Sequence, residues 1–366
     1  MRRKIYQELL QWKQRSGESA LLVQGARRVG KSYIVEAFAK AEYKSYILID
    51  FNLVDQPVKE MFEHDLVDLK TFFMKLTTYY GVKLYERESL IIFDEVQLFP
   101  RARSAIKYLV ADGRYDYIET GSLISIRENV KDILIPSEED HVDMYPLDFE
   151  EFLWANGNDT MMDFIRDCYR KKAPLGQALH RKAMDLFRQY LIVGGMPQAV
   201  NAFVKHNDFD EVDRVKRRIL NLYRDDIRKH AKGYEMKVEA IYDEIPSQMK
   251  NQNQHFKLSS LKQGARFDEY KDAMFWLSDA MIVNHCYNAT EPTFGLNLNR
   301  DRTLLKCYMG DTGLLISHAF DENGIVTGEV YKKLLLDKLE VNMGMVMENM
   351  VAQMLTASGH KLYFYS

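Results

Sequence analysis

The segment from Leu21 to Lys40, LLVQGARRVGKSYIVEAFAK, constrains the fold more than any other part of the sequence. An apolar run ends at Gly25, the tripeptide Gly-Lys-Ser follows at residues 30–32, and a helical pattern begins there. A G-x-x-x-x-G-K-[ST] spacing between a strand and a helix predicts a loop whose backbone N–H groups hold phosphate oxygens. The helix adds unpaired N–H groups and the positive end of its dipole. The alternative is a glycine turn that carries a solvated lysine.

Two residues of this loop have specific expected roles. Lys31 is expected to reach the β- and γ-phosphates of a nucleotide, and the Ser32 hydroxyl to ligate Mg²⁺. The predicted nucleotide-binding residues are Gly25, Arg28, Val29, Gly30, Lys31, Ser32 and Tyr33.

A second acidic site follows the apolar run SLIIFDEV at residues 89–96. Asp94 and Glu95 stand at the carboxyl end of a predicted buried strand, where ligands bind open α/β sheets. Asp94 is expected to hold Mg²⁺ through water, and Glu95 to act as general base toward the attacking water. A solvated Asp-Glu loop is the alternative. The sequence contains no Asn-Lys-x-Asp motif for guanine, which favours ATP over GTP.

The next predicted strand, YDYIETGS at residues 115–122, also ends in polar residues. Thr120 is the first candidate, and Ser122 the second, to hydrogen-bond the attacking water or the γ-phosphate. A strand-end turn with satisfied hydroxyls is the alternative. Arg127 is a candidate arginine finger, while Arg27 and Arg28 could face solvent, phosphate or DNA.

Apolar strand patterns alternate with helical patterns from residue 20 to about residue 155. This alternation predicts an α/β fold with a mostly parallel sheet and helices on both faces. Beyond Leu153 the pattern is helical, with a long helix at 211–233, until a hairpin-like stretch at 282–309. Helices followed by a hairpin suggest a winged-helix-like module. A final helix and the strand KLYFY occupy residues 340–366.

Composition excludes several classes of protein. The chain of 366 residues has a net charge of -3, so it has no overall basic character for binding nucleic acid. Its three cysteines have no paired spacing, and no run of 18 apolar residues or signal-peptide core occurs. These features predict a cytoplasmic protein with no membrane partner.

The chain resembles the bacterial and archaeal AAA+-like P-loop ATPases that carry a C-terminal domain of unknown function. The resemblance rests on GARRVGKS, IIFDEVQ, ETGSL, MYPLDFEEFLWA, YLIVGGMPQAV, LYRDDIRKHA, MGDTGLL and GMVMENMVAQML. It implies a winged-helix region followed by a restriction-endonuclease-like core. Many members have a Gly-Arg pair before the MYPLDFEEFL-like segment, but residues 135–137 here read Ile-Pro-Ser. No trans-acting arginine is therefore carried over.

We expect four domains on this basis. They are a P-loop ATPase domain (1–155), a helical, lid-like region (156–235), a winged-helix-like module (236–310) and an incomplete endonuclease-like α/β domain (311–366). Glu348 matches the glutamate on the first helix of such nucleases, but the acidic hairpin position and the Glu-x-Lys pair are absent. The chain is therefore expected to have no nuclease activity and to be a truncated member.

DNA binding has two candidate helices. In the helix at 266–280, two basic residues stand against four acidic ones, a net charge of -2 that repels phosphates. The helix at 214–232 is more basic, with the cations Arg214, Lys216, Arg217, Arg218, Arg224, Arg228, Lys229 and Lys232. It is the predicted DNA contact if these cations share one exposed face, and otherwise a solvated surface.

The leading hypothesis is an ATP-binding, Mg²⁺-dependent ATPase that acts as a conformational switch or motor for the C-terminal domains. The alternative is a nucleotide-gated module that binds DNA or protein with negligible turnover. A homo-oligomer or a partner protein is a further expectation, since sites of this type often borrow an arginine from a neighbour.

Overall fold

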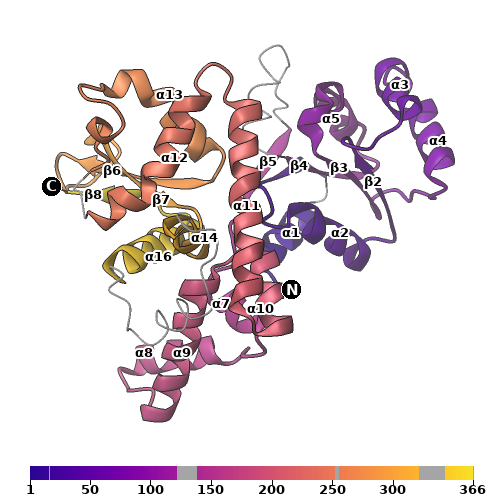
Figure 1. Cartoon of the computed structure of the whole chain (residues 1–366). Helices are drawn as coiled ribbons and strands as arrows, with labels where there is room; N and C mark the ends of the chain where they lie inside the picture. The colour runs from indigo at the N-terminus through magenta and orange to yellow at the C-terminus, as the bar shows by residue number, and fades with distance from the viewer. Residues whose placement is uncertain (16, 122–137, 252–254, 321–342, 366) are drawn as a thin grey trace. The chain divides into compact units, whose positions relative to one another are not determined.

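A computed structural model describes residues 1–15, 17–121, 138–251, 255–320 and 343–365 (Figure 1). The chain divides into two compact units. The N-terminal unit spans Arg3–Met144, and the C-terminal unit comprises Tyr145–Ser366 with Met1–Arg2. Within the described ranges, no helix combines the length and the apolar content needed to cross a bilayer.

The N-terminal unit contains a five-stranded parallel sheet. Its order is β2 (Ser45–Asp50), β3 (Ser89–Asp94), β4 (Asp116–Gly121), β1 (Ala20–Gln24) and β5 (Glu139–Asp143). Every residue of β3 is buried, as expected for a strand covered on both faces. Because all strands run the same way, the carboxyl ends of β1, β3 and β4 meet at one edge of the sheet.

Helices cover both faces of this sheet (Figure 1). On one face lie α1 (Ile5–Gln14) and α2 (Lys31–Glu42); on the other lie α3 (Gln56–His64), α4 (Leu69–Tyr80) and α5 (Pro100–Asp112). Phe62, Phe72 and Phe93 belong to the core between the sheet and the second group, and Phe62 makes edge-to-face contacts with both of the others. The predicted fold class is confirmed, whereas α3 was not predicted.

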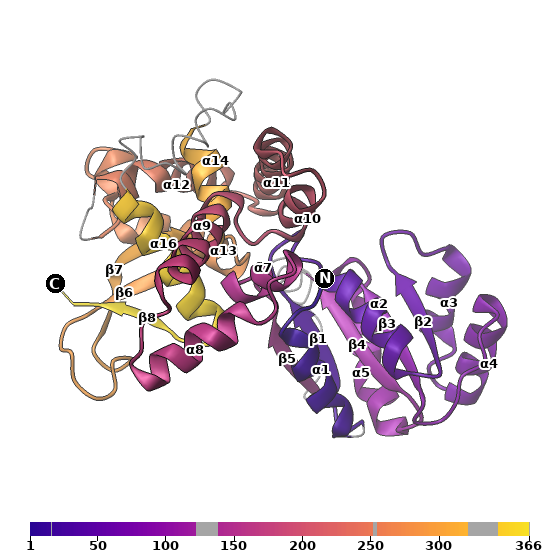
Figure 2. The same ribbon diagram turned by 90° about the horizontal axis from the view of Figure 1, so that it is seen from below.

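The C-terminal unit is mainly helical (Figure 2). Its helices are α7 (Phe149–Ala155), α8 (Met161–Lys171), α9 (Gln177–Val193), α10 (Pro197–His206), α11 (Phe209–His230), α12 (Glu235–Lys250), α13 (Phe267–Asp279), α14 (Thr312–Ala319) and α16 (Met343–Ala357). The expected helix break at the Gly-Gly-Met-Pro sequence lies between α9 and α10. The long helix expected at 211–233 is α11.

A small three-stranded sheet completes this unit. The strands β6 (Val283–Ala289) and β7 (Arg300–Met309) form the expected antiparallel hairpin, and β8 (Leu362–Phe364) pairs in parallel with β6. The hairpin that we assigned to a winged-helix-like module and the strand that we assigned to an endonuclease-like domain therefore share one sheet. The four-domain division and the winged-helix assignment stay predictions.

Two backbone segments of the C-terminal unit cross at glycines, in what we call the glycine crossing (Gly194, Gly195 and Gly313). A Cβ atom at Gly313 would collide with the carbonyl oxygen of Val193 and with Gly194, so the crossing leaves no room for a side chain. The Asp311 carboxylate accepts hydrogen bonds from the N–H groups of Gly195 (2.5 Å) and Leu314 (2.9 Å). Burial raises the pKa of Asp311, against the hydrogen bonds that it accepts.

Lys216 of α11 lies beside the glycine crossing and is fully buried. Its Nζ donates to the carbonyl oxygen of Ile192 at 2.8 Å. Burial lowers the pKa of Lys216 to about 8, although the carboxylates of Asp213 and Asp311 act in the opposite direction.

Candidate functional site

The predicted phosphate loop joins β1 to α2. A Cβ atom at Gly25 would meet the carbonyl oxygen of Met144, so only glycine fits there. Arg28 (φ 71°) and Gly30 (φ 96°) have left-handed backbone conformations. Changes of handedness within a short loop turn successive N–H groups to one side and make a concave site for anions. The local geometry is therefore that of an anion cradle at the start of a helix.

Lys31 is the first residue of α2, and only 8% of it is exposed. Its Nζ donates to the carbonyl oxygens of Gly25 (2.9 Å) and Ala26 (3.1 Å). The positive charge is thus held against the loop. Phosphate oxygens would be stronger partners for an ammonium group than these neutral carbonyls.

Three oxygen-bearing side chains meet at the carboxyl edge of the sheet. Strand β4 lies between β1 and β3, and its register pairs Thr120 with Val23 of β1. The Ser32 hydroxyl donates to Asp94 Oδ1 at 2.7 Å, and the Thr120 hydroxyl donates to the same oxygen. Asp94 and Thr120 are buried. The structure therefore brings together three residues that are far apart in the sequence.

Glu95 follows Asp94 with a left-handed backbone (φ 52°), which turns the chain out of β3. Its N–H donates to Thr120 Oγ1 at 3.4 Å, and its Oε2 accepts a hydrogen bond from Gln97 Nε2. Gln97 is buried in the short 3₁₀ turn Val96–Leu98. Gln97 lies within the IIFDEVQ motif but had no predicted role.

The donor set fits a magnesium ion. Mg²⁺ prefers hard oxygen ligands and usually takes only one or two from the protein, with phosphate oxygens and water supplying the rest. The Ser32 hydroxyl and the Asp94 carboxylate are such ligands and already lie within hydrogen-bond distance. The described ranges contain no group of three or more His, Cys, Asp or Glu side chains that could hold a metal ion, so the protein's ligands here would be one carboxylate and one hydroxyl.

A buried ion cluster includes Glu119, the residue before Thr120 on β4. Arg103 of α5 donates to Glu119 (2.7 Å) and to Glu139 (3.0 Å), and all three side chains are buried. Burial and the neighbouring Glu139 carboxylate raise the pKa of Glu119 well above its usual range, against the pull of Arg103. This cluster connects β4, β5 and α5 and so helps to position the strand end that carries Thr120.

The other predicted site residues lie in different surroundings. The side chains of Arg28 and Tyr33 are exposed, with Tyr33 at 65%, whereas Val29 is fully buried. Arg3 donates to the Val29 carbonyl oxygen at 3.1 Å. Ser122, Arg127 and the Ile135–Ser137 segment lie outside the described residues.

Only some cations of the basic helix predicted to contact DNA are exposed and lie on one face. Lys216 is buried, Arg217 pairs with Asp213 at 2.6 Å, and Arg224 pairs with Asp243 at 3.1 Å. The exposed cations that share one face of α11, by helical spacing, are Arg214, Arg218, Arg228 and Lys229. Arg214 and Arg228 are paired with Glu211 and Glu239, respectively.

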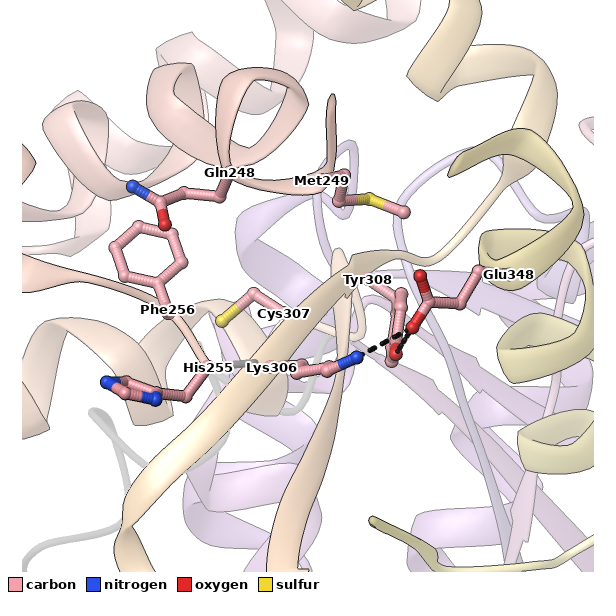
Figure 3. A pocket seen from close by; sticks show the side chains of 8 residues that line it. All are labelled: Gln248, Met249, His255, Phe256, Lys306, Cys307, Tyr308 and Glu348. Atoms are coloured by element: carbon pink, nitrogen blue, oxygen red, sulfur yellow. Dashed lines mark hydrogen bonds and ion pairs between the residues drawn. The ribbon is translucent and has the colours of Figure 1, made fainter. Parts of the chain in front are cut away.

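Glu348, the residue matched to a nuclease glutamate, lies in a small hollow between α12, β7 and α16 (Figure 3). Its Oε1 accepts hydrogen bonds from Lys306 Nζ (2.8 Å) and Tyr308 (2.6 Å). Burial raises the pKa of Glu348, but these two hydrogen bonds outweigh it, so the net shift is downward. The hollow, of about 20 Å³, has room for about one water molecule.

Comparisons with known proteins agree with this geometry. Residues 17–153 match an AAA domain, and residues 184–323 match a domain of unknown function. No curated protein matches the chain significantly. The AAA match thus falls on the part of the chain that carries the phosphate loop, Asp94 and Thr120.

Solved structures of similar fold were also found. The Walker-type ATPase paby2304 of Pyrococcus abyssi overlaps with a TM-score of 0.50 at 13% identity, over 87% of this chain and 95% of that one. The Orc1 protein of Aeropyrum pernix in complex with DNA overlaps with a TM-score of 0.31 at 9% identity, over 89% and 94% of the two chains. PCH-2 of C. elegans overlaps with a TM-score of 0.31 at 13% identity, over 55% and 60%. The first of these likenesses shows a shared fold.

Proposed function

We propose that this chain binds ATP with Mg²⁺ and hydrolyses it, and that hydrolysis acts as a conformational switch or motor for the C-terminal unit. The convergence of Ser32, Asp94 and Thr120 beside the phosphate loop supports the proposal most directly. A glycine turn with a solvated lysine would not bury Lys31 or place a carboxylate next to Ser32.

The loop residues would bind the triphosphate. Lys31 would exchange the carbonyl oxygens of Gly25 and Ala26 for the β- and γ-phosphates. Backbone N–H groups of Arg28, Val29 and Gly30 and of the first turn of α2, including Tyr33, would complete the cradle. Ser32 and Asp94 would hold the metal ion, which when bound neutralises charge on the phosphates.

Glu95 would act as the general base toward the attacking water. The hydrogen bond from Gln97 restricts where its carboxylate can lie. Thr120 donates its proton to Asp94 and accepts the Glu95 N–H, and a hydroxyl oxygen has a second lone pair. Thr120 would use that lone pair to accept a hydrogen bond from the attacking water.

The test compares the intact chain with Lys31→Ala and Glu95→Gln variants, in ATP binding by calorimetry and in phosphate release. Glu95→Gln should reduce kcat by about 10²–10⁴-fold and leave ATP binding intact, because the amide cannot take a proton. Glu86→Gln, an exposed carboxylate of the same unit, is the matched control. ATP binding without any hydrolysis by the intact chain would favour the nucleotide-gated binding module instead.

DNA is a second candidate ligand. The observation that favours it is the row of exposed cations on α11, of which Arg218 and Lys229 have no ion pair among the described residues. Reversing both charges should lower the slope of log affinity for double-stranded DNA against log salt by about 1–2. An unchanged slope would exclude this face.

The oligomeric state belongs to the same proposal. An arginine from a second copy or from a partner protein would complete the site. Sizing with and without ATP tests for a second copy. The cytoplasmic location stays a prediction.

A further inference from the structure

A groove of about 480 Å³ lies on the N-terminal unit, away from the phosphate loop. Its walls are α4 from Lys70 to Thr78, the loop at 81–84 and the residues just before β4. The strands are parallel, and the groove lies where β3 and β4 begin, whereas Asp94 and Thr120 lie where these strands end. The groove is therefore at the opposite edge of the sheet and is separate from the nucleotide site.

Apolar side chains line the groove together with the hydroxyl groups of Thr77 and Thr78. Phe73 and Tyr115 make an edge-to-face contact with ring centroids 4.9 Å apart, and Val82 lies beside them in the lining. Met74 also lines the groove, and 61% of it is exposed. A methionine adapts its shape to different partners and is often used at surfaces that bind peptides. A groove of this volume has room for one or two side chains of a partner.

The rim of the groove is basic. Lys70, Lys83 and Arg114 line it, and no acidic side chain does so among the described residues. Arg114 is neutralised by Asp112 (2.6 Å), and its guanidinium lies 4.8 Å from the centre of the Phe73 ring. No ion pair within the described part of the chain neutralises Lys70 or Lys83. The Asp68 carboxylate acts on Lys70 at longer range, without an ion pair. Two positive charges outside ion pairs thus flank the apolar side chains of the groove.

We propose that this groove binds an acidic segment of a partner protein, with one apolar side chain in the groove and flanking carboxylates on Lys70 and Lys83. Complementary charge at a rim around an apolar centre is the usual arrangement of a protein interface. Nucleic acid fits less well, since its affinity depends on neutralising many phosphates and this rim offers two cations outside ion pairs. The occupant is therefore a polypeptide with both acidic and apolar side chains.

The experiment uses the full chain and short fluorescein-labelled peptides in which a central Leu or Phe is flanked by Asp and Glu. Fluorescence anisotropy should show saturable binding of these acidic peptides. Peptides with the same apolar residue flanked by Lys should bind at least about tenfold more weakly. A labelled single-stranded oligonucleotide is the third probe. Preference for the oligonucleotide, equal binding of the basic peptides or no saturable binding of the acidic peptides would overturn the proposal.

Variants locate the binding to the groove. Lys70→Glu combined with Lys83→Glu should weaken acidic-peptide binding at least about tenfold, and Met74→Glu should weaken it independently. Lys107→Glu, an equal charge change at an exposed position on α5, is the control and should have less than about a twofold effect. ATP binding by each variant, measured in parallel, reports that the unit is folded. Peptide binding that survives all the groove variants would also overturn the proposal.

Discussion

The phosphate-loop site and the glycine crossing are both buried polar clusters, but their hydrogen bonds differ in kind. At the site, hydroxyl and carboxylate oxygens at strand ends bind one another, and Lys31 holds carbonyls of its own loop. At the crossing, Asp311 and Lys216 bind backbone groups of other segments in a space that excludes even a methyl group. Hydrogen bonds between side chains at the edge of a sheet can be exchanged for bonds to a ligand. Hydrogen bonds to backbone groups at the glycine crossing instead stabilise the fold. The predictions below test this distinction.

The largest expected effect is that of Lys31→Ala on ATP binding. Loss of the ammonium group should lower ATP affinity by more than about a hundredfold, because charge-assisted contacts to phosphate are lost. The melting temperature without nucleotide should change little, since the lost partners are two carbonyls of the same loop and join no other segment. Calorimetric titration and thermal unfolding measure the two quantities. A large loss of stability with retained ATP affinity would show that Lys31 stabilises the fold and does not bind the nucleotide.

The second prediction concerns pH and the crossing. Lys216 has a pKa of about 8 in the folded chain, below its usual 10.5, so the unfolded chain binds more protons between these values. The free energy of unfolding should therefore rise as pH increases from 8 to 10.5, with Lys216 contributing about 3 kcal/mol. In Lys216→Met this contribution should vanish. Denaturant unfolding of both proteins at about pH 7.5 and at about pH 10.5 measures the difference. A parallel pH dependence in the two proteins would contradict the prediction.

The third prediction tests the space at the crossing. Gly313→Ala places a methyl group against the Val193 carbonyl and should destabilise the chain by about 2 kcal/mol. Gly81→Ala is the control, because φ is 64° there and nothing lies within 4 Å of the added methyl group. It should cost about 1 kcal/mol from backbone conformation alone. ATP affinity should stay unchanged in both variants. A Gly313→Ala protein as stable as the wild type would show that the crossing can relax.

The smallest expected effect is at Gln97. Removing its amide in Gln97→Ala should lower kcat about tenfold with KM unchanged, because Glu95 loses a group that positions it but ATP loses no contact. Gln97→Asn should recover part of the loss if the amide itself matters. A change in KM alone would show that Gln97 acts on binding instead. Steady-state kinetics separate these outcomes.

The sequence predicted most of the N-terminal unit because its signals are local. Apolar runs defined the strands, and the spacing of Gly25, Gly30 and Lys31 defined the loop. Strand order depends on long-range packing and could not be read from the sequence, although the position of β4 is what brings Thr120 to Asp94. The contact between Gln97 and Glu95 depends on the left-handed turn at Glu95, which has no clear sequence signature.

The sequence was less informative about the C-terminal unit. Eight cations on one helix suggested a basic face, but the burial of Lys216 and the pairing of Arg224 with Asp243 are tertiary features. Likewise, β8 pairs with β6 across a long stretch of chain, so local patterns suggested two modules where the structure has one sheet. Glu348 was matched to a nuclease glutamate from the neighbouring sequence alone. The structure shows that its carboxylate accepts hydrogen bonds from Lys306 and Tyr308.

The hydroxyl hydrogen bonds around Asp94 run in one direction, from Ser32 and Thr120 to the carboxylate. An ionised carboxylate can only accept hydrogen bonds, and each hydroxyl has a single proton to donate. Since Ser32 and Thr120 both direct that proton to Asp94 Oδ1, their remaining lone pairs point elsewhere. The hydroxyls of Ser32 and Thr120 thus offer electron pairs rather than protons to a ligand. These two hydroxyls would suit electron-poor species, a metal ion at Ser32 and the O–H of a water molecule at Thr120, whereas phosphate oxygens would be held by Lys31 and the loop N–H groups.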